Sequence, residues 1–271
     1  MNPLLNNGVH MSDKLFSVKD QVVLVTGGSR GIGKELASAF VRRDAHVIIA
    51  GRHKQTLDET ATEISTPSNS VSAQICDVSS TDDVELLIES VISQHGRIDT
   101  LVSVAGINKR MKAESYTIDE YDSITDINAK GAWIIAQAVG RKMIPQGSGS
   151  IINVDSLNTY APLRGTTPYA MSKASVLMMT RGLANEWGRH GIRVNSIAPG
   201  FIHTDLTKKV WADETMRAWG KTNTPLERLG KVSDLVGAAI FLASDASQFM
   251  TGQTLRVDGG FTAGINWPVE L

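Results

Sequence analysis

A short apolar run followed by closely spaced glycines and a helical segment constrains the fold of this 271-residue chain more than any other stretch. The run at residues 21–26, QVVLVT, is continuous and β-branched, which is typical of a strand buried on both faces of a parallel sheet. Gly27, Gly31 and Gly33 follow it, and residues 34–41 have a helical pattern. Glycines let the backbone approach a pyrophosphate, and the first N–H groups of a helix face such an anion. Glycines can also serve only a tight turn, but the flanking strand and helix favour an anion site.

The same alternation of strand and helix continues to the end of the chain. Further strands are predicted at residues 46–50, 71–75, 98–104, 150–154, 192–198 and 253–257, and helices at 84–91, 168–187, 232–242 and at least the second half of 120–143. This pattern predicts an α/β protein of the Rossmann type, with a doubly wound parallel sheet covered by helices on both faces. We expect a single domain over residues 15–271, preceded by a flexible tail at residues 1–14.

The residues that follow the strand ends should gather at one edge of the sheet, where ligands bind. They are Thr26, Arg52, Asp77, Ala105, Ser156 and Pro199. Asp77 would accept a hydrogen bond from an adenine amino group, cap the helix that begins near Ser79, or do both. Residues 201–230 follow the sixth strand and interrupt the alternation. An insertion at this place is commonly a lid, so we predict a substrate lid rather than a helical excursion that pads the surface.

Composition excludes several classes of function. The chain is 42% hydrophobic and 20% charged, and its net charge of −1 gives no reason to expect a nucleic-acid or membrane-surface partner. No apolar run approaches the roughly 18 residues of a membrane-spanning helix. Cys76 is the single cysteine, so no disulfide can form within the chain, which suits a cytoplasmic protein. We expect no metal site.

The end of the second strand indicates which dinucleotide would bind. An acidic residue here accepts hydrogen bonds from the adenosine ribose 2′-hydroxyl, whereas a nearby arginine accommodates a 2′-phosphate. The strand ends in Gly51-Arg52-His53-Lys54, with no carboxylate before Asp58, and Arg30 in the glycine loop can reach the same region. The sequence therefore favours NADP(H) and leaves NAD(H) open, unless Arg52 is only a solvated residue that starts the next helix.

A tyrosine and a lysine four residues apart would share one face of the helix that begins near Pro168. The Lys173 cation is expected to lower the pKa of Tyr169 from about 10, and such a tyrosine can exchange a proton with an alcohol or a carbonyl. Ser156, at the end of a strand, could hold the same oxygen. The pair alone could also be a chance feature of a surface helix. Asn128 lies within a predicted helix, where asparagine is unfavourable, either at the surface or at a kink with a polar role.

Together these motifs resemble the short-chain dehydrogenase/reductase family in its single-domain form, over roughly residues 15–265. Four residues fall where the family keeps its catalytic tetrad: Asn128, Ser156, Tyr169 and Lys173. The resemblance implies the following cofactor-binding residues: Gly27, Ser29, Arg30, Gly31, Ile32, Gly33, Arg52, Asp77, Val78, Ala105, Gly106, Tyr169, Lys173, Pro199, Gly200, Ile202 and Thr204. Two positions depart from the family pattern. Ser103 replaces an asparagine that braces the sheet, and Asp155 stands where a second serine is usual.

The resemblance also implies a mechanism. Tyr169 would act as general acid or base toward the substrate oxygen, and Ser156 would hold that oxygen. Lys173 would lower the Tyr169 pKa and bind the nicotinamide ribose, while Asn128 would hold a water that links Lys173 to solvent. A secondary alcohol and its ketone would interconvert with NADP(H) as hydride carrier. A relative that binds nucleotide only as a regulator would be expected to have lost one of these four residues.

Several local runs are most similar to the gluconate 5-dehydrogenase group of the family, at residues 105–110, 156–158, 185–187 and 257–261. This similarity implies a sugar acid or a polyol as substrate and reduction of 5-ketogluconate. The candidate substrate contacts are Ser156, Asn158, Arg164, Tyr169 and His203, with Arg110 in a neighbouring loop. Arginine suits bidentate carboxylate binding, although these arginines could equally be solvated loop charges.

Two points stay open in the sequence. A 3-oxoacyl-thioester reductase is the competing assignment; it would need a basic patch for an acidic carrier protein, and no such cluster stands out. The family resemblance suggests a homotetramer packed through residues 120–143 and 168–187, and the sequence alone does not separate this from a dimer.

Overall fold

The computed structural model describes residues 14–205 and 207–265, and within them the chain forms one sheet of seven parallel strands. The strands are β1 (Val22–Thr26), β2 (His46–Gly51), β3 (Ser72–Ile75), β4 (Thr100–Ser103), β5 (Gly149–Val154), β6 (Ile192–Pro199) and β7 (Thr254–Val257). They lie in the order β3-β2-β1-β4-β5-β6-β7, so the predicted doubly wound α/β fold is confirmed. The predicted flexible tail lies outside the described residues, except for Lys14.

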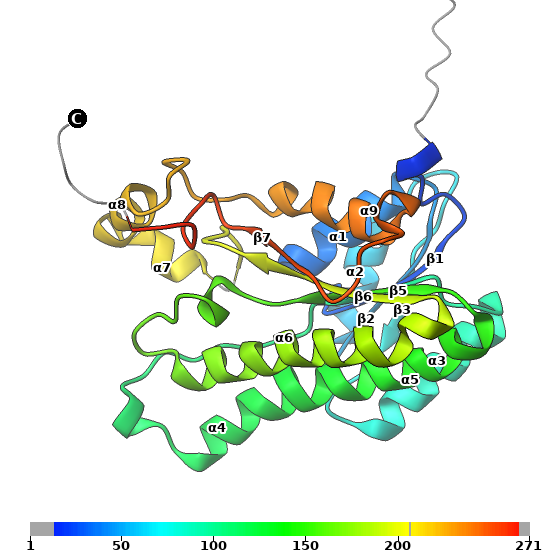
Figure 1. Cartoon of the computed structure of the whole chain (residues 1–271), viewed down its shortest axis with the longest axis horizontal. Helices are drawn as coiled ribbons and strands as arrows, with labels where there is room; N and C mark the ends of the chain where they lie inside the picture. The colour runs from blue at the N-terminus through cyan, green and yellow to red at the C-terminus, as the bar shows by residue number, and fades with distance from the viewer. Residues whose placement is uncertain (1–13, 206, 266–271) are drawn as a thin grey trace, which may run out of the picture.

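Helices cover both faces of the sheet (Figure 1). They are α1 (Gly31–Val41), α2 (Lys54–Ile64), α3 (Thr81–His95), α4 (Ile118–Thr125), α5 (Ala132–Gln146), α6 (Thr167–Trp187), α7 (Lys208–Ala212), α8 (Glu214–Thr222) and α9 (Val236–Ala243). The core on one face includes residues of α1, α2 and α9, and the core on the other face includes residues of α3, α5 and α6. Val23 and Val25 of β1 belong to the first core, and Val22 and Leu24 to the second. This burial on both faces explains why the strand is apolar at every position.

The helices differ from the prediction more than the strands do. Each predicted strand is present, within about two residues of its predicted limits. A helix was expected after the second strand, but no limits were predicted for α2, because its buried positions Leu57, Thr60, Ala61 and Ile64 include a polar and a small residue and its remaining positions are mostly polar. Helix α3 extends beyond the predicted 84–91 at both ends, since the helical geometry continues across its polar flanks.

The order of the strands locates the place where a ligand should bind. Strands are added in opposite directions on the two sides of β1, and in open α/β sheets ligands bind outside the carboxyl ends at such a reversal. Gly27 follows β1 and Ala105 lies two residues after β4. A Cβ atom built on Gly27 would lie 2.9 Å from the Ala105 nitrogen, so the two loops meet at this point.

The segment at residues 201–230 leaves the sheet after β6 and forms α7 and α8, at one end of the molecule (Figure 1). Its two ends are joined. The Gly230 nitrogen donates to the Phe201 carbonyl at 2.9 Å, and the His203 nitrogen donates to the Gly230 carbonyl at 2.9 Å. The segment therefore leaves and re-enters the fold at a single place. In the part of the chain that the structure describes, no helix is long and apolar enough to cross a membrane.

Candidate active site

The loop between β1 and α1 presents backbone without side chains. Gly27 and Gly31 have φ angles of 65° and 54°, which glycine adopts readily. A Cβ atom on Gly33 would lie 2.2 Å from the Gly27 carbonyl oxygen, so no side chain fits there. The buried Thr60 hydroxyl on α2 donates to the Ser29 carbonyl at 2.8 Å and anchors the loop. The loop thus forms a cradle that added side chains would disrupt, and this cradle fits the pyrophosphate of a dinucleotide.

The loop after β6 approaches the same cradle. A Cβ atom on Gly31 would lie 3.7 Å from the Thr204 Cβ. The Thr204 nitrogen donates to the Thr207 hydroxyl at 2.9 Å, and the Gly200 nitrogen donates to the Val257 carbonyl at 3.0 Å. Gly31 and Thr204 are 173 positions apart in the chain, and both were assigned to the same cofactor from the sequence. The structure brings them together in space.

Basic side chains lie beyond the ends of β1 and β2. Arg30 and Arg52 are exposed, and neither forms an ion pair within the described residues. Burial alone would raise the pKa of Asp77. Hydrogen bonds from the Ser79 nitrogen and hydroxyl, at 3.0 and 2.7 Å, together with the Arg52 charge, outweigh that effect and lower the pKa. Arg52 and Asp77 therefore lie within electrostatic reach of each other at the carboxyl edge of the sheet.

The N-cap residue of helix α3 is Ser80 and not Asp77, the residue that the sequence suggested. The Ser80 hydroxyl accepts a hydrogen bond from the Asp83 nitrogen at 3.2 Å, and α3 begins at Thr81. The suggestion that Asp77 caps this helix is therefore wrong, because its carboxylate is engaged by Ser79 one turn earlier. Contact of Asp77 with an adenine stays a prediction, as does contact of the buried Val78 with the cofactor.

Thr26, which the sequence placed at the ligand-binding edge of the sheet, braces the ends of β1 and β4. The Thr26 hydroxyl accepts hydrogen bonds from the Val104 nitrogen at 3.2 Å and the Ala105 nitrogen at 3.5 Å. Ser103, at the place of the bracing asparagine, is itself buried. Thr26 therefore ties together the two strand ends that flank the glycine-rich loop.

Asn128 occupies a π-helical turn, residues Asp126–Gly131, between α4 and α5. Its side chain is 1% exposed, so the interpretation as a surface residue is wrong and the interpretation as a kink with a polar role is confirmed. Its Oδ1 accepts from the Ile107 nitrogen at 2.8 Å, while Nδ2 donates to the Ile107 carbonyl at 2.8 Å and to the Ser172 hydroxyl at 3.1 Å. The side chain thus fastens the loop after β4 to α6.

Ser156 and Tyr169 come together from separate elements. Ser156 lies just after β5, and Tyr169 lies in the first turn of α6, next to Pro168. Ser156 is 6% exposed, and its hydroxyl lies close enough to the Tyr169 phenol to lower the pKa of that phenol. A strand end and a helix start therefore hold two hydroxyl groups against each other.

The expected lowering of the Tyr169 pKa by Lys173 is wrong for this structure. Burial raises the pKa of Tyr169; the Ser156 hydrogen bond and the Arg110 charge oppose that increase, and Asp155 adds to it. The Lys173 amine lies 5.9 Å from the centroid of the tyrosine ring and donates to the Val154 carbonyl at 2.7 Å. Because burial raises the Tyr169 pKa above its ordinary value, the phenol keeps its proton at neutral pH.

Lys173 shares its buried surroundings with a carboxylate. Lys173 is 5% exposed, and burial lowers its pKa to about 8 against the opposing charge of Asp155. Asp155 is 1% exposed, and burial raises its pKa to about 6. Its Oδ1 accepts from the Thr159 hydroxyl at 2.6 Å, and its Oδ2 has no hydrogen-bond partner within the described residues. A Cβ atom on Gly106 would lie 3.6 Å from the Lys173 amine, so the loop after β4 reaches this group as well.

Both amide atoms of Asn158 form hydrogen bonds close to Ser156. Its backbone nitrogen and its Nδ2 both donate to the Ser156 hydroxyl, at 3.1 and 3.3 Å. Its Oδ1 accepts from the Leu163 nitrogen at 3.0 Å and from the Thr166 hydroxyl at 2.9 Å. Direct contact of Asn158 with a substrate stays a prediction, and these bonds leave the second hydrogen of its Nδ2 for such a contact.

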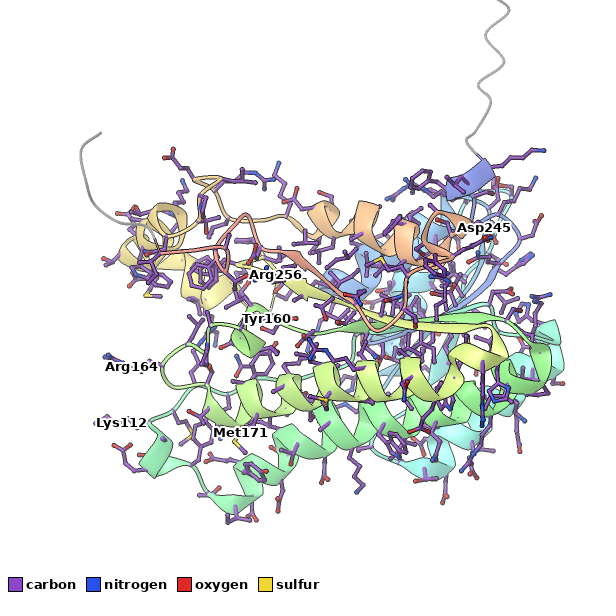
Figure 2. The ribbon with its side chains drawn as sticks, in the orientation of Figure 1. Lys112, Tyr160, Arg164, Met171, Asp245 and Arg256 are labelled. Carbon is purple, nitrogen blue, oxygen red and sulfur yellow. The ribbon has the colours of Figure 1, made fainter. Side chains whose placement is uncertain are left out.

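The three basic residues expected near the substrate differ in position. The Arg110 charge acts on the Tyr169 phenol and lowers its pKa, which places this side chain within electrostatic reach of the phenol. Arg164 is exposed and extends away from the ribbon, as Lys112 does (Figure 2). His203 is exposed in the loop that follows β6. Arg110 is therefore the stronger candidate for an anion contact.

An aromatic cluster fixes the 201–230 segment beside Ser156. Phe201 packs edge-on against Trp211 and Phe261, with ring centroids 5.3 and 4.6 Å apart, and Trp219 lies 5.5 Å from Phe201. Leu157, the neighbour of Ser156, belongs to the same apolar cluster. The position of the segment is thereby coupled to the turn that carries Ser156.

Comparisons with known proteins agree over nearly the whole chain. The sequence pattern of a family described as enoyl-(acyl carrier protein) reductase matches residues 27–262. A gluconate 5-dehydrogenase of Gluconobacter oxydans is 38% identical over 251 residues, which cover 93% of this chain and 98% of that protein. A 3-oxoacyl-[acyl-carrier-protein] reductase of Thermotoga maritima is 36% identical over 243 residues, which cover 90% and 98%.

A solved structure shares the fold closely. It is that of a gluconate 5-dehydrogenase from Burkholderia cenocepacia J2315 in complex with NADP and tartrate. Its TM-score to this chain is 0.90 and its sequence is 35% identical, with 93% of this chain and 99% of that chain covered.

Proposed function

Because the chain belongs to the short-chain dehydrogenase/reductase family, we propose that it interconverts a secondary alcohol and a ketone with NADP(H), acting on a sugar acid or a polyol. Reduction of 5-ketogluconate is the specific reaction. Relatives named gluconate 5-dehydrogenase or 5-keto-D-gluconate 5-reductase, at 38% and 34% identity, support this choice.

Tyr169 serves as the proton donor to the ketone oxygen. A phenol whose pKa is raised by burial stays protonated at neutral pH, and this is the form that reduction requires. Ser156 donates a hydrogen bond to the same oxygen and stabilises the negative charge that develops on it. In the reverse direction, Tyr169 would have to be ionised and accept the alcohol proton. Its raised pKa makes the ionised phenolate a stronger base for this step.

The cofactor-binding residues fit NADP(H), which when bound supplies or accepts the hydride. The side-chain-free cradle of Gly27, Gly31 and Gly33 would hold the pyrophosphate. Lys173 would bind the nicotinamide ribose hydroxyls, since it is the buried cation closest to the Tyr169 ring. Asn128 keeps the loop after β4 in place beside Lys173.

Two unpaired arginines support NADP(H) over NAD(H). Arg30 and Arg52 are exposed near the place where the adenosine ribose would lie, and each is free of ion pairs within the described residues. An arginine at this place accommodates a 2′-phosphate. The related structure that is described in complex with NADP supports the same choice.

The position of Arg110 is the observation that carries the substrate class. Its charge reaches the Tyr169 phenol, which is the group that would face the substrate oxygen. A guanidinium within electrostatic reach of the phenol is suited to bind a carboxylate of a substrate whose ketone lies at the phenol. The tartrate in the related structure, a hydroxylated dicarboxylate, supports a site for polar anions.

Reduction of a 3-oxoacyl thioester is the second candidate. It is favoured by the description of the matching family and by the Thermotoga maritima relative. A long acyl chain would need an apolar path, and the aromatic cluster of Phe201, Trp211 and Leu157 beside Ser156 is the surface that could supply one. A non-catalytic regulator is disfavoured, because all four tetrad residues are present.

Three further expectations accompany this function. We propose that residues 201–230 act as a lid over the substrate, since the segment is joined to the fold at one place. We propose a homotetramer packed through α4, α5 and α6, supported by exposed apolar side chains on α5 and α6: Trp133, Met171 and Met178. Localisation in the cytoplasm stays a prediction from the sequence.

Parallel assays test the proposal. NADPH oxidation is measured at neutral pH with 5-keto-D-gluconate and with an acetoacetyl thioester. Turnover of the keto acid alone supports the sugar-acid function, and turnover of the thioester alone favours the second candidate. Binding of NADPH without turnover of either would leave the fold and the cofactor in place and refute both substrates.

A further inference from the structure

The side chain of Asn158 lies against the Ser156 hydroxyl. Asn158 is 7% exposed and lies in the short turn that follows β5. Its Oδ1 faces the Leu163 nitrogen at 3.0 Å. A backbone N–H can only donate, so this contact fixes the orientation of the amide and leaves the NH₂ group facing Ser156.

The Ser156 oxygen receives two hydrogen bonds from this single residue. The Asn158 backbone nitrogen donates at 3.1 Å and the Asn158 Nδ2 at 3.3 Å. A hydroxyl oxygen has two lone pairs and one proton. With both lone pairs engaged, the proton is directed away from Asn158, and Ser156 can act only as a donor in the remaining direction.

We infer that Asn158 is a positioning residue that makes Ser156 an obligatory hydrogen-bond donor to the substrate oxygen. The inference rests on the proposed function, because it assumes that this oxygen takes the place beside Ser156 and Tyr169. A donor that is already oriented stabilises a developing alkoxide without reorganising. The amide adds polarisation as well, because hydrogen bonds accepted by the serine oxygen strengthen the bond that its own proton makes.

Thr166 supports the same arrangement from the start of α6. Its hydroxyl contacts the Asn158 Oδ1 at 2.9 Å and the Leu163 carbonyl at 2.8 Å. Thr166 is 1% exposed, so this network is closed to solvent. The turn that carries Ser156 and the helix that carries Tyr169 are therefore linked through the amide of Asn158.

Replacement of Asn158 by aspartate and by alanine separates proton direction from simple bracing of the turn. The carboxylate of N158D can still accept from the Leu163 nitrogen and the Thr166 hydroxyl, but it would also accept the Ser156 proton and turn it away from the substrate. Alanine in N158A makes none of these side-chain hydrogen bonds, so the Ser156 hydroxyl is free to rotate. We expect kcat to fall about tenfold in N158A and about 100-fold or more in N158D. A bracing role predicts the opposite order, and N158D more active than N158A would overturn the inference.

A second comparison tests whether Asn158 acts through Ser156. In an S156A background, N158A should cause no further loss of kcat, because the hydroxyl that Asn158 orients is absent. Equal fold-losses from N158A with and without Ser156 would contradict the inference. This cycle also stands if N158D does not fold, since it needs only S156A, N158A and their combination.

A spectroscopic titration makes the test independent of turnover. The ionisation of Tyr169 is followed by ultraviolet absorbance, with the Y169F titration subtracted. N158D should raise the Tyr169 pKa more in the presence of Ser156 than in S156A, because only there does the phenol lose a donor as well as gain a nearby charge. Equal increases would refute proton direction. Absence of ketone reduction by the wild type would instead refute the proposed function and leave this titration valid.

Discussion

Replacement of Asp155 by asparagine should remove a loss of stability that the wild type undergoes between acidic and neutral pH, while narrowing the pH range of its activity. Burial raises the Asp155 pKa from 3.8 to about 6. The ionised form is therefore disfavoured by folding, and the wild type loses stability as pH rises from about 4 through about 6. A difference of about two pH units, at about 1.4 kcal/mol per unit, amounts to about 3 kcal/mol. D155N stays neutral and does not incur this loss.

The assay is urea unfolding of the wild type and D155N at about pH 4 and about pH 8. The free energy of unfolding of D155N relative to the wild type should increase between these pH values by about 3 kcal/mol. Any constant cost of burying the amide cancels in this comparison. D82N is a matched control, because Asp82 is exposed on the first turn of α3. An equal difference in free energy of unfolding between D155N and the wild type at both pH values would refute the assignment of Asp155 as a buried carboxyl group whose ionisation is disfavoured.

The pH dependence of activity should also change in D155N, with activity lost at a lower pH than in the wild type. Burial lowers the Lys173 pKa to about 8, and the Asp155 charge opposes that decrease. Without Asp155, Lys173 should lose its proton about one pH unit lower, given the usual effect of a nearby opposite charge. We therefore expect the alkaline limb of kcat/KM to move to lower pH in D155N. An unchanged limb would show that Lys173 and Asp155 are not coupled.

Two other substitutions test the cofactor and substrate assignments. R52D should weaken NADPH binding much more than NADH binding, because it replaces the proposed partner of the 2′-phosphate by a carboxylate; titration of protein fluorescence measures both, and equal losses would contradict the NADP(H) assignment. R110M should raise KM for 5-keto-D-gluconate about tenfold or more, because a charge-assisted contact is lost, whereas R164M should leave it close to the wild-type value, since Arg164 extends away from the fold. Similar KM values for R110M and the wild type would remove Arg110 from the substrate site.

The strands could be predicted from the sequence because a strand buried on both faces must be apolar throughout. In β1, Val22 and Leu24 face one core while Val23 and Val25 face the other, so the run itself carries the signal. Helix α2 gave no comparable signal, because Leu57, Ala61 and Ile64 are its only buried large or aliphatic residues. The elements that could be predicted from the sequence were therefore those with a regular pattern of buried apolar residues, whatever their helix propensity.

The residues of the site could be predicted from the sequence more readily than their hydrogen bonds and protonation states. Spacing predicted that Tyr169 and Lys173 share a helix face, but the direction of the lysine amine depends on the Val154 carbonyl, which is distant in sequence. Similarly, nothing in the sequence reveals that both amide atoms of Asn158 form hydrogen bonds close to Ser156. The spacing Tyr-x-x-Ser-Lys does place Ser172 on α6, yet its contact with Asn128 depends on the π-turn. Such contacts arise only when separate elements pack together.

Replacement of Tyr169 by phenylalanine tests the central claim most directly. Reduction of 5-keto-D-gluconate by NADPH is followed for wild-type protein and Y169F, with NADPH binding measured in parallel. The account predicts that the wild type reduces the ketone and that Y169F retains NADPH binding while kcat falls about 100-fold to 10,000-fold, because the proton donor is lost. Turnover of Y169F at the wild-type rate would contradict the assignment of Tyr169 as the general acid and the mechanism built on it.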